Sequence, residues 1–182
     1  MKELSLNILD IAQNSISAKA SLITIKVDKD EAKNLLTLTV EDNGRGMSEE
    51  FVRNVCDPFV TTRTTRKVGM GIPLLKLAAE QADGEFGIES ELDVGTTVTA
   101  TFKLNHIDRT PLGDIGQTMS MLVSCNENID FVYRHLSQGQ EFCFDTRQIR
   151  EILGGVPFNE PDVVLWIQEY IRDGILSING GV

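Results

Sequence analysis

The sequence has few cysteines and no long apolar run. Its three cysteines, Cys56, Cys125 and Cys143, lie far apart and show no CxxC spacing, which argues against both a disulfide framework and a zinc site. No stretch of about eighteen apolar residues is present, so no membrane span is expected. The N-terminus lacks a basic start, an uninterrupted apolar run and a small-residue cleavage site, so no signal peptide is expected. We therefore expect a cytoplasmic protein without a membrane segment.

Basic residues are also scarce. The chain has 17 Lys and Arg against 27 Asp and Glu, which gives a formal net charge of −10. This balance disfavours a broad basic face for a polyanion, so nucleic acid is not expected as a partner. At 182 residues the chain fits one large domain, or a domain of about a hundred residues with a small appendage, and we expect the second.

The first hundred residues predict a sheet with helices on one side. The segments 22–28 and 35–41 alternate apolar and polar residues and are joined by a charged turn, which indicates an antiparallel hairpin. The remaining strands are expected near 85–91 and 96–104. Helices are expected over 3–18, from Ser48 to a stop at Pro58, and from Pro73 to Gly84.

After Leu104 the pattern changes to a linker, HIDRTPLGD, followed by a different series of elements. We divide the chain into 1–104 and a small α+β segment over 105–182 whose role the sequence does not reveal. Its apolar strip is interpreted as core packing, with a partner groove as the alternative: Val163, Val164, Trp166, Ile167, Tyr170 and Ile171. The expected elements are a helix near 112–124, strands near 129–136 and 141–145, and helices over 146–153 and 160–173.

The most specific motif is EDNGRGM, residues 41–47, directly after a predicted strand. Gly44 and Gly46 let the backbone turn tightly and approach a planar ring. Asp42, at the strand end, can accept a hydrogen bond from an exocyclic amine. Alone, the motif also fits an ordinary turn that ends a strand.

A second motif, GMGI at 69–72, lies just ahead of the helix expected from Pro73. Successive amides of a glycine loop at a helix N-terminus form an anion site, which suits a phosphate. A structural connection between loop and helix explains the same pattern equally well.

A third feature is a polar row on the first predicted helix, formed by Glu3, Asn7, Asp10 and Asn14. Asn14 offers an amide oxygen to a magnesium ion, and Asp10, one turn earlier, offers a carboxylate that could orient or deprotonate a water. A solvated helix face is the alternative interpretation.

Together these motifs resemble the Bergerat-type ATPase domain of the GHKL superfamily, which includes gyrase, the large heat-shock chaperone, histidine kinases and MutL. DIAQNSISAKASLITI at 10–25 resembles its N box, and EDNGRGM and GMGIPLLK resemble its two glycine boxes. PFVTTR at 58–63 resembles the segment leading into the ATP lid, and GTTVTATF at 95–102 resembles the last glycine-threonine motif. The resemblance covers about residues 1–104 and implies an α+β fold, a two-layer sandwich.

The resemblance also implies a site for ATP or ADP with magnesium. Asp42 would accept a hydrogen bond from the adenine amino group, and Thr96 would support the water network beside it. Asn14 would hold Mg²⁺ against the phosphates, and Asp10 would be the catalytic carboxylate. Arg66 and Lys67 would add positive charge near the triphosphate, although such a loop also fits simple solvation. The implied nucleotide-binding residues are Asn14, Asp42, Gly44, Gly46, Met47, Phe59, Thr62, Arg63, Gly69, Met70, Gly71, Ile72 and Thr96.

The chain departs from efficient ATPases of the superfamily, which usually carry Glu where this sequence has Asp10. Whether the chain hydrolyses ATP therefore stays an open question. An alternative register pairs Asn7 with Ile11, but it puts an apolar residue at the magnesium position. The chain's histidines, His106 and His135, lie downstream of the ATP motifs and neither is followed by an acidic residue. Autophosphorylation within this chain is therefore not expected.

A stand-alone domain of this kind resembles the small serine kinases that act as anti-sigma factors. That resemblance implies a regulatory protein kinase that acts in trans on a partner protein. Two alternatives remain open: a non-catalytic module that senses ATP and recruits a partner, and a slow ATPase. A homodimer also remains open.

Overall fold

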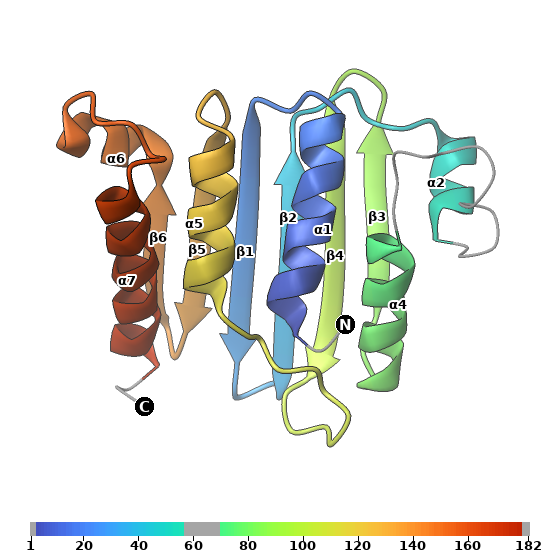
Figure 1. Ribbon diagram of the computed structural model, residues 1–182. Helices are drawn as coiled ribbons and strands as arrows, with labels where there is room; N and C mark the ends of the chain where they lie inside the picture. The colour runs from blue at the N-terminus through green and yellow to red at the C-terminus, as the bar shows by residue number, and fades with distance from the viewer. Residues whose placement is uncertain (1–2, 57–69, 180–182) are drawn as a thin grey trace.

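The computed structural model describes residues 3–56 and 70–179. These residues form a six-stranded sheet and six helices (Figure 1). The strands are β1 (Leu22–Asp30), β2 (Leu35–Asp42), β3 (Phe86–Glu91), β4 (Gly95–Lys103), β5 (Asp130–Ser137) and β6 (Gln140–Asp145). The helices are α1 (Leu4–Ser17), α2 (Glu49–Val55), α4 (Gly71–Gln81), α5 (Ile115–Cys125), α6 (Thr146–Leu153) and α7 (Pro161–Ile178).

The strands follow the order β3-β4-β2-β1-β5-β6. The predicted hairpin is confirmed: β1 and β2 pair antiparallel, with Ile25 opposite Val40. Neighbouring pairs are antiparallel except β1 with β5, which run parallel with Ile25 opposite Tyr133. The parallel pair needs a long crossover, and α5 lies within that connection.

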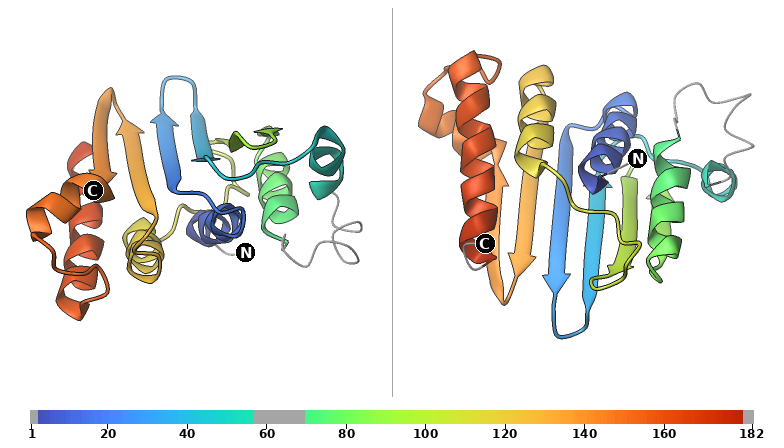
Figure 2. Two further views of the ribbon diagram at one scale, coloured as in Figure 1. Left: turned by 90° about the horizontal axis from the view of Figure 1, so that it is seen from above. Right: turned by 60° about the horizontal axis from the view of Figure 1, so that its bottom comes forward.

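The helices cover one face of the sheet, as the view from above shows (Figure 2). Alternation along the strands explains this two-layer arrangement. In β1, Ile23, Ile25 and Val27 are fully buried, whereas Thr24 and Lys26 on the other face are only partly buried. The largest fully buried side chains include Phe102, Phe131, Tyr133 and Phe144. They extend the core through both predicted parts of the chain, 1–104 and 105–182.

The C-terminal strands continue the sheet of the first segment, because β5 pairs directly with β1 over eight residues. Helix α7 packs chiefly on α5 and on β6. The sequence does not predict this pairing, because alternation within β5 does not indicate which strand lies beside it. The division of the chain at residue 104 stays a prediction, and the two predicted parts share one sheet.

Some predicted boundaries differ from the structure. Helix α4 begins at Gly71, two residues before Pro73, and α7 continues to Ile178 instead of ending near 173. The apolar strip of α7 is only partly core: Val163, Ile167 and Ile171 are buried, whereas Trp166 and Tyr170 are more than a third exposed and stack on each other. None of the described helices has both the length and the apolar character required to cross a membrane.

Candidate functional site

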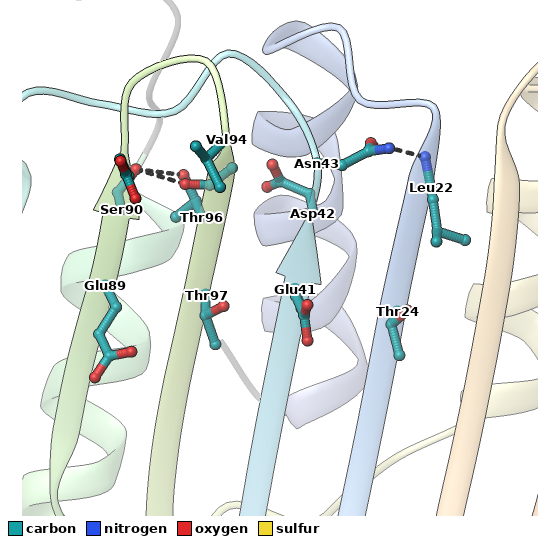
Figure 3. A pocket seen from close by; sticks show the side chains of 12 residues that line it. Leu22, Thr24, Glu41, Asp42, Asn43, Glu89, Ser90, Val94, Thr96 and Thr97 are labelled. Atoms are coloured by element: carbon teal, nitrogen blue, oxygen red, sulfur yellow. Dashed lines mark hydrogen bonds between the residues drawn. The ribbon is translucent and has the colours of Figure 1, made fainter.

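Three polar side chains form a row where β2 and β3 end and β4 begins. Asp42 pairs with Thr96, and Thr96 pairs with Ser90 on its other side. By alternation all three belong to the helix-covered face, in line with the buried Val40 and Val98. Figure 3 shows the three residues side by side at the strand ends. Directly opposed residues of neighbouring strands interact, so the sheet itself holds these side chains together.

The carboxylate of Asp42 is held from two sides. The buried hydroxyl of Ser15 in α1 donates to Oδ2 at 2.6 Å, and the backbone amide of Gly44 donates to Oδ1 at 2.8 Å. An ionised carboxylate has about four lone-pair sites and accepts only. Both oxygens therefore keep capacity for a further donor, in an orientation fixed by α1 and by the following loop.

Glycines let the loop after β2 lie close to the neighbouring strands. Gly46 has φ +68°, and a Cβ built on it would lie 1.9 Å from the carbonyl oxygen of Glu91. Gly95 has φ +148°, and its Cβ would lie 2.0 Å from the carbonyl oxygen of Asp42. Only glycine satisfies both the conformation and the space. The two glycines thus allow the close approach that brings Asp42, Thr96 and Ser90 together.

The hydroxyl of Ser90 links the loop to the strands. It accepts from the backbone amide of Met47 at 2.8 Å and contacts the Thr96 hydroxyl at 2.7 Å. Its distance to the carbonyl oxygen of Gly95 is 3.1 Å. Met47 itself packs, partly buried, against the core. Ser90 therefore connects three of the residues that lie at these strand ends.

Helix α4 starts beside Asp10 of α1. A Cβ built on Gly71 would lie 2.7 Å from the Cβ of Asp10, so the two helices touch here. The amides of a first helical turn have no partner within the helix, and they form the positive end of its dipole. Gly71 and Ile72 supply such amides, whereas Pro73 has none. Desolvation by partial burial raises the pKa of the Asp10 carboxyl, which makes it a stronger base than an exposed aspartate.

Asn14 lies one helical turn beyond Asp10 and is half-buried. Its amide nitrogen is buried and finds no hydrogen-bond partner among the described residues. An unpaired buried amide is costly, and rotating the amide exchanges its oxygen and nitrogen. Asn14 therefore fits an incoming group, either an oxygen-rich anion on the nitrogen or a cation on the oxygen.

The polar row of α1 is not a solvated face. Asn7 is 1% exposed, and Glu3, Asp10 and Asn14 are half-buried.

Four residues that the sequence places in the site, Phe59, Thr62, Arg63 and Gly69, lie outside the described residues, as do Arg66 and Lys67. Met70 is at the N-cap of α4 and is 45% exposed. The structure thus brings together Asp42, Gly44, Gly46, Met47 and Thr96 at the strand ends. It also puts Asp10 beside Gly71 at the start of α4, with Asn14 one turn further along α1 and Ile72 next to Gly71.

A shallow hollow of about 370 Å³ lies at the same strand ends, and it faces the helix-free side of the sheet. Figure 3 views this hollow with the helices behind the strands. Thr24, Glu41, Thr97 and Glu89 line it from that side, while Asp42, Ser90 and Thr96 contribute at its rim. By alternation the side chains of these three rim residues belong to the opposite face. We therefore assign the candidate site to the helix-covered face.

Sequence reasoning missed Ser15 and Ser90 as site residues. A signal for each was present: Ser15 interrupts the apolar row of Leu4, Ile8 and Ile11, and Ser90 continues the inward-facing series of Phe86 and Ile88. A hydroxyl on an inward-facing position needs a partner. Periodicity alone does not identify that partner, because the partner lies in a distant part of the chain.

A comparison with family models supports the resemblance of the motifs to an ATPase family. A family model described as "Histidine kinase-, DNA gyrase B-, and HSP90-like ATPase" matches residues 1–106. The match covers more than half of the 182 residues, and the chain belongs to this family. Membership implies ATP binding by a histidine kinase-like domain.

Several of the curated relatives are kinases of greater length. Sensor histidine kinase YvrG of Bacillus subtilis (strain 168) is 28% identical over 94 residues, which is 50% of this chain and 16% of that protein. Sporulation kinase C of the same strain is 30% identical over 98 residues, or 53% of this chain and 22% of that protein. The chain therefore spans less than a quarter of the length of either relative.

Among solved structures, the MutL ATPase domain of Aquifex aeolicus, complexed with ADP, is similar in fold. The TM-score is 0.55 at 15% identity, over 85% of this chain and 70% of that chain. The similarity confirms the predicted α+β fold class. Because 85% of 182 residues exceeds the 106 residues of the family match, the likeness of fold reaches into the C-terminal segment.

Proposed function

We propose that this chain binds ATP with Mg²⁺ on the helix-covered face and uses it as a regulatory protein kinase, transferring phosphate in trans to a partner protein. The base would lie against Asp42 and Thr96 at the strand ends. The phosphates would lie toward the N-terminus of α4. The observation that supports the catalytic part is the contact of Asp10 with Gly71, because it would put a carboxylate of raised pKa near the proposed phosphates.

The described residues fit a magnesium ion that is held jointly with phosphates. No group of three or more His, Cys, Asp or Glu side chains suited to a metal occurs in residues 3–56 and 70–179. Mg²⁺ in nucleotide sites usually takes one or two protein oxygens and the phosphates as ligands, so Asn14 suffices as a protein contribution. When bound, the ion would neutralise charge that develops on the phosphate oxygens.

In the proposed transfer, the hydroxyl oxygen of a partner side chain forms a bond to the γ-phosphorus while the bond to the β,γ-bridging oxygen breaks, and ADP leaves. Asp10 accepts the hydroxyl proton. The amides of Gly71 and Ile72 stabilise negative charge on the phosphates. The kinases among the relatives support a transfer reaction, and the regulatory role in trans is our proposal.

Calorimetric titration with ATP and Mg²⁺ tests the binding step. We expect binding by the wild type and a loss of about 1.5–3 kcal/mol, roughly ten- to 150-fold, for Asp42→Asn, because an acceptor becomes an amide that can present a donor. Asp145→Asn is a matched control, since Asp145 caps α6 at the opposite edge of the sheet. No binding by the wild type, or equal affinity of Asp42→Asn and wild type, contradicts the assigned site.

Release of phosphate and its transfer to co-purified proteins test the catalytic step. A wild type that binds ATP but shows neither release nor transfer would favour a non-catalytic ATP-sensing module. The shorter Asp10 side chain, where efficient ATPases of the family carry Glu, is the observation that favours this second candidate. Release without transfer would indicate a slow ATPase.

A further inference from the structure

We infer that Ser90 is a positioning residue that turns the Thr96 hydroxyl into a hydrogen-bond acceptor, so that the site selects a base edge carrying an amine over one carrying a carbonyl. The inference rests on the proposed function, since it concerns the base that the same site binds. Ser90 is half-buried in β3 and lies beyond Thr96 as seen from Asp42. It therefore acts through Thr96.

The direction of each hydrogen bond follows from the partners of Ser90. A serine hydroxyl has one proton to donate and two lone pairs to accept with. The amide of Met47, at 2.8 Å, can only donate, and the carbonyl of Gly95, at 3.1 Å, can only accept. All contacts are satisfied together in one arrangement, in which Ser90 donates to Gly95 and accepts from both Met47 and Thr96. The proton positions are assigned from this network.

This arrangement fixes the Thr96 hydroxyl as a hydrogen-bond acceptor toward a ligand. The Thr96 hydroxyl donates its only proton to the Ser90 oxygen, 2.7 Å away, so that only its lone pairs remain for a ligand. Asp42, the neighbour on the other side, also presents only acceptors. Two adjacent acceptors match an exocyclic amine with two protons. A carbonyl at the same place would face oxygen lone pairs without a proton between them, and a site of buried polar groups discriminates strongly against such a mismatch.

Removing the Ser90 hydroxyl would free the Thr96 hydroxyl to donate to a ligand. In Ser90→Ala, the Thr96 hydroxyl loses its acceptor and can turn its proton toward the ligand. A carbonyl edge then finds a donor, while an amine edge loses one acceptor. Both changes lower the preference for the amine. A purely structural role of Ser90 would weaken binding of all nucleotides in the same proportion and would leave the preference unchanged.

The test compares the affinities for ATP and for inosine triphosphate, whose base carries a carbonyl where adenine carries the amine, by calorimetry in the presence of Mg²⁺. The wild type should prefer ATP, and Ser90→Ala should lower the ATP-to-inosine-triphosphate affinity ratio by at least about tenfold, the value of one hydrogen bond. Ser90→Thr keeps a hydroxyl and should retain the ratio. Ser120→Ala is a matched control, because among the described residues that buried serine bonds only within α5.

A second variant keeps the test decisive where Ser90→Ala fails to fold. Thr96→Val removes the selecting hydroxyl at equal shape, so it should lower the ratio while Ser90 remains. An unchanged ratio in Ser90→Ala or in Thr96→Val overturns the inference and leaves the proposed ATP site standing. Failure of the wild type to bind either nucleotide overturns the proposed function, and with it this inference.

Discussion

Two pairs of glycines with positive φ, one at the strand ends of the site and one in the C-terminal segment, differ in what surrounds them. At the ends of β2 and β4, Gly46 and Gly95 lie against backbone carbonyls, and half-buried polar groups bond to one another. In the C-terminal segment, Gly139 and Gly154 also have positive φ, but a Cβ on either would meet nothing within 4 Å. Gly46 and Gly95 allow close approach of backbone segments, whereas Gly139 and Gly154 only form turns. Substitution at these two pairs of glycines therefore separates the cost of positive φ from the cost of lost space.

The largest expected effect separates these two kinds of glycine. Gly46→Ala and Gly139→Ala both place an L residue at positive φ, which costs roughly 1–2 kcal/mol. Only Gly46→Ala also forces a Cβ onto a carbonyl oxygen, and overpacking adds about 1–3 kcal/mol. Urea unfolding should show the larger loss in Gly46→Ala, and calorimetry should show that this variant alone loses affinity for ATP.

Equal losses of stability in the two variants would break the comparison. It would mean that the loop after β2 can shift to accommodate a methyl group, so that its close contact with Glu91 does not determine the site. Retained ATP affinity in Gly46→Ala would lead to the same conclusion.

The second prediction concerns a buried polar pair in the C-terminal half. The hydroxyl of Tyr133 lies 2.7 Å from Nδ1 of His135, and Nε2 of His135 is buried without a partner among the described residues. Burial raises the pKa of Tyr133, which stays protonated, and the donor of this hydrogen bond depends on the tautomer of His135. Burial is also the main cause that lowers the pKa of His135 to about 4; the positive Lys29 lowers it further and Asp28 opposes it.

The depressed pKa of His135 predicts acid sensitivity. In the unfolded chain a histidine takes up its proton near pH 6.5. Between about pH 6.5 and 4 the unfolded state is protonated and the folded state is not, so the free energy of unfolding falls as pH falls, by about 3 kcal/mol at most. Urea unfolding across this range should show a flatter pH dependence for His135→Gln than for wild type. A wild-type slope retained by His135→Gln would instead assign the acid sensitivity to other groups.

The third prediction distinguishes two side chains of α1. Asn14→Ala removes the proposed magnesium ligand and should weaken ATP binding, because the phosphates then lack their bridging ion. Asp10→Asn keeps that ligand and should retain binding while turnover falls by about a hundredfold, as for loss of a general base. Titration and phosphate release, measured on both variants, check the difference. Parallel loss of binding and turnover in both would remove Asp10 from the catalytic role.

Local sequence patterns predict part of the fold and part of this site. Hydrophobic periodicity predicts α1 and the β1–β2 hairpin, because these elements depend on neighbours in sequence. The motif after β2 indicates Asp42, Gly44 and Gly46, since a strand end followed by glycines has a local signature. Neither pattern indicates the bond from Ser15 to Asp42, 27 residues apart, nor the parallel pairing of β5 with β1. Both depend on tertiary packing, which local pattern does not encode.

The smallest expected effect lies where α7 is joined to α5. Asp114 caps α5 by accepting from the amide of Gln117 at 3.0 Å, and it forms an ion pair with Arg172 of α7. The Arg172 guanidinium holds the pKa of the Asp114 carboxyl below its usual range. Both side chains are at least a third exposed, so the pair contributes little in water, roughly 0.2–1 kcal/mol.

Asp114→Asn keeps the cap, since Asn is as good an N-cap as Asp, and removes only the charge. It should therefore lower the free energy of unfolding by less than about 1 kcal/mol, and Arg172→Gln should do the same. The double variant should lose little more than either single one, because both changes remove one interaction. Urea unfolding of the three variants measures these losses, and calorimetry should find their ATP affinity unchanged. A change in ATP affinity would instead show that the contact between α5 and α7 is coupled to the strand ends of β2 and β4, and the two halves of the sheet would no longer be separable.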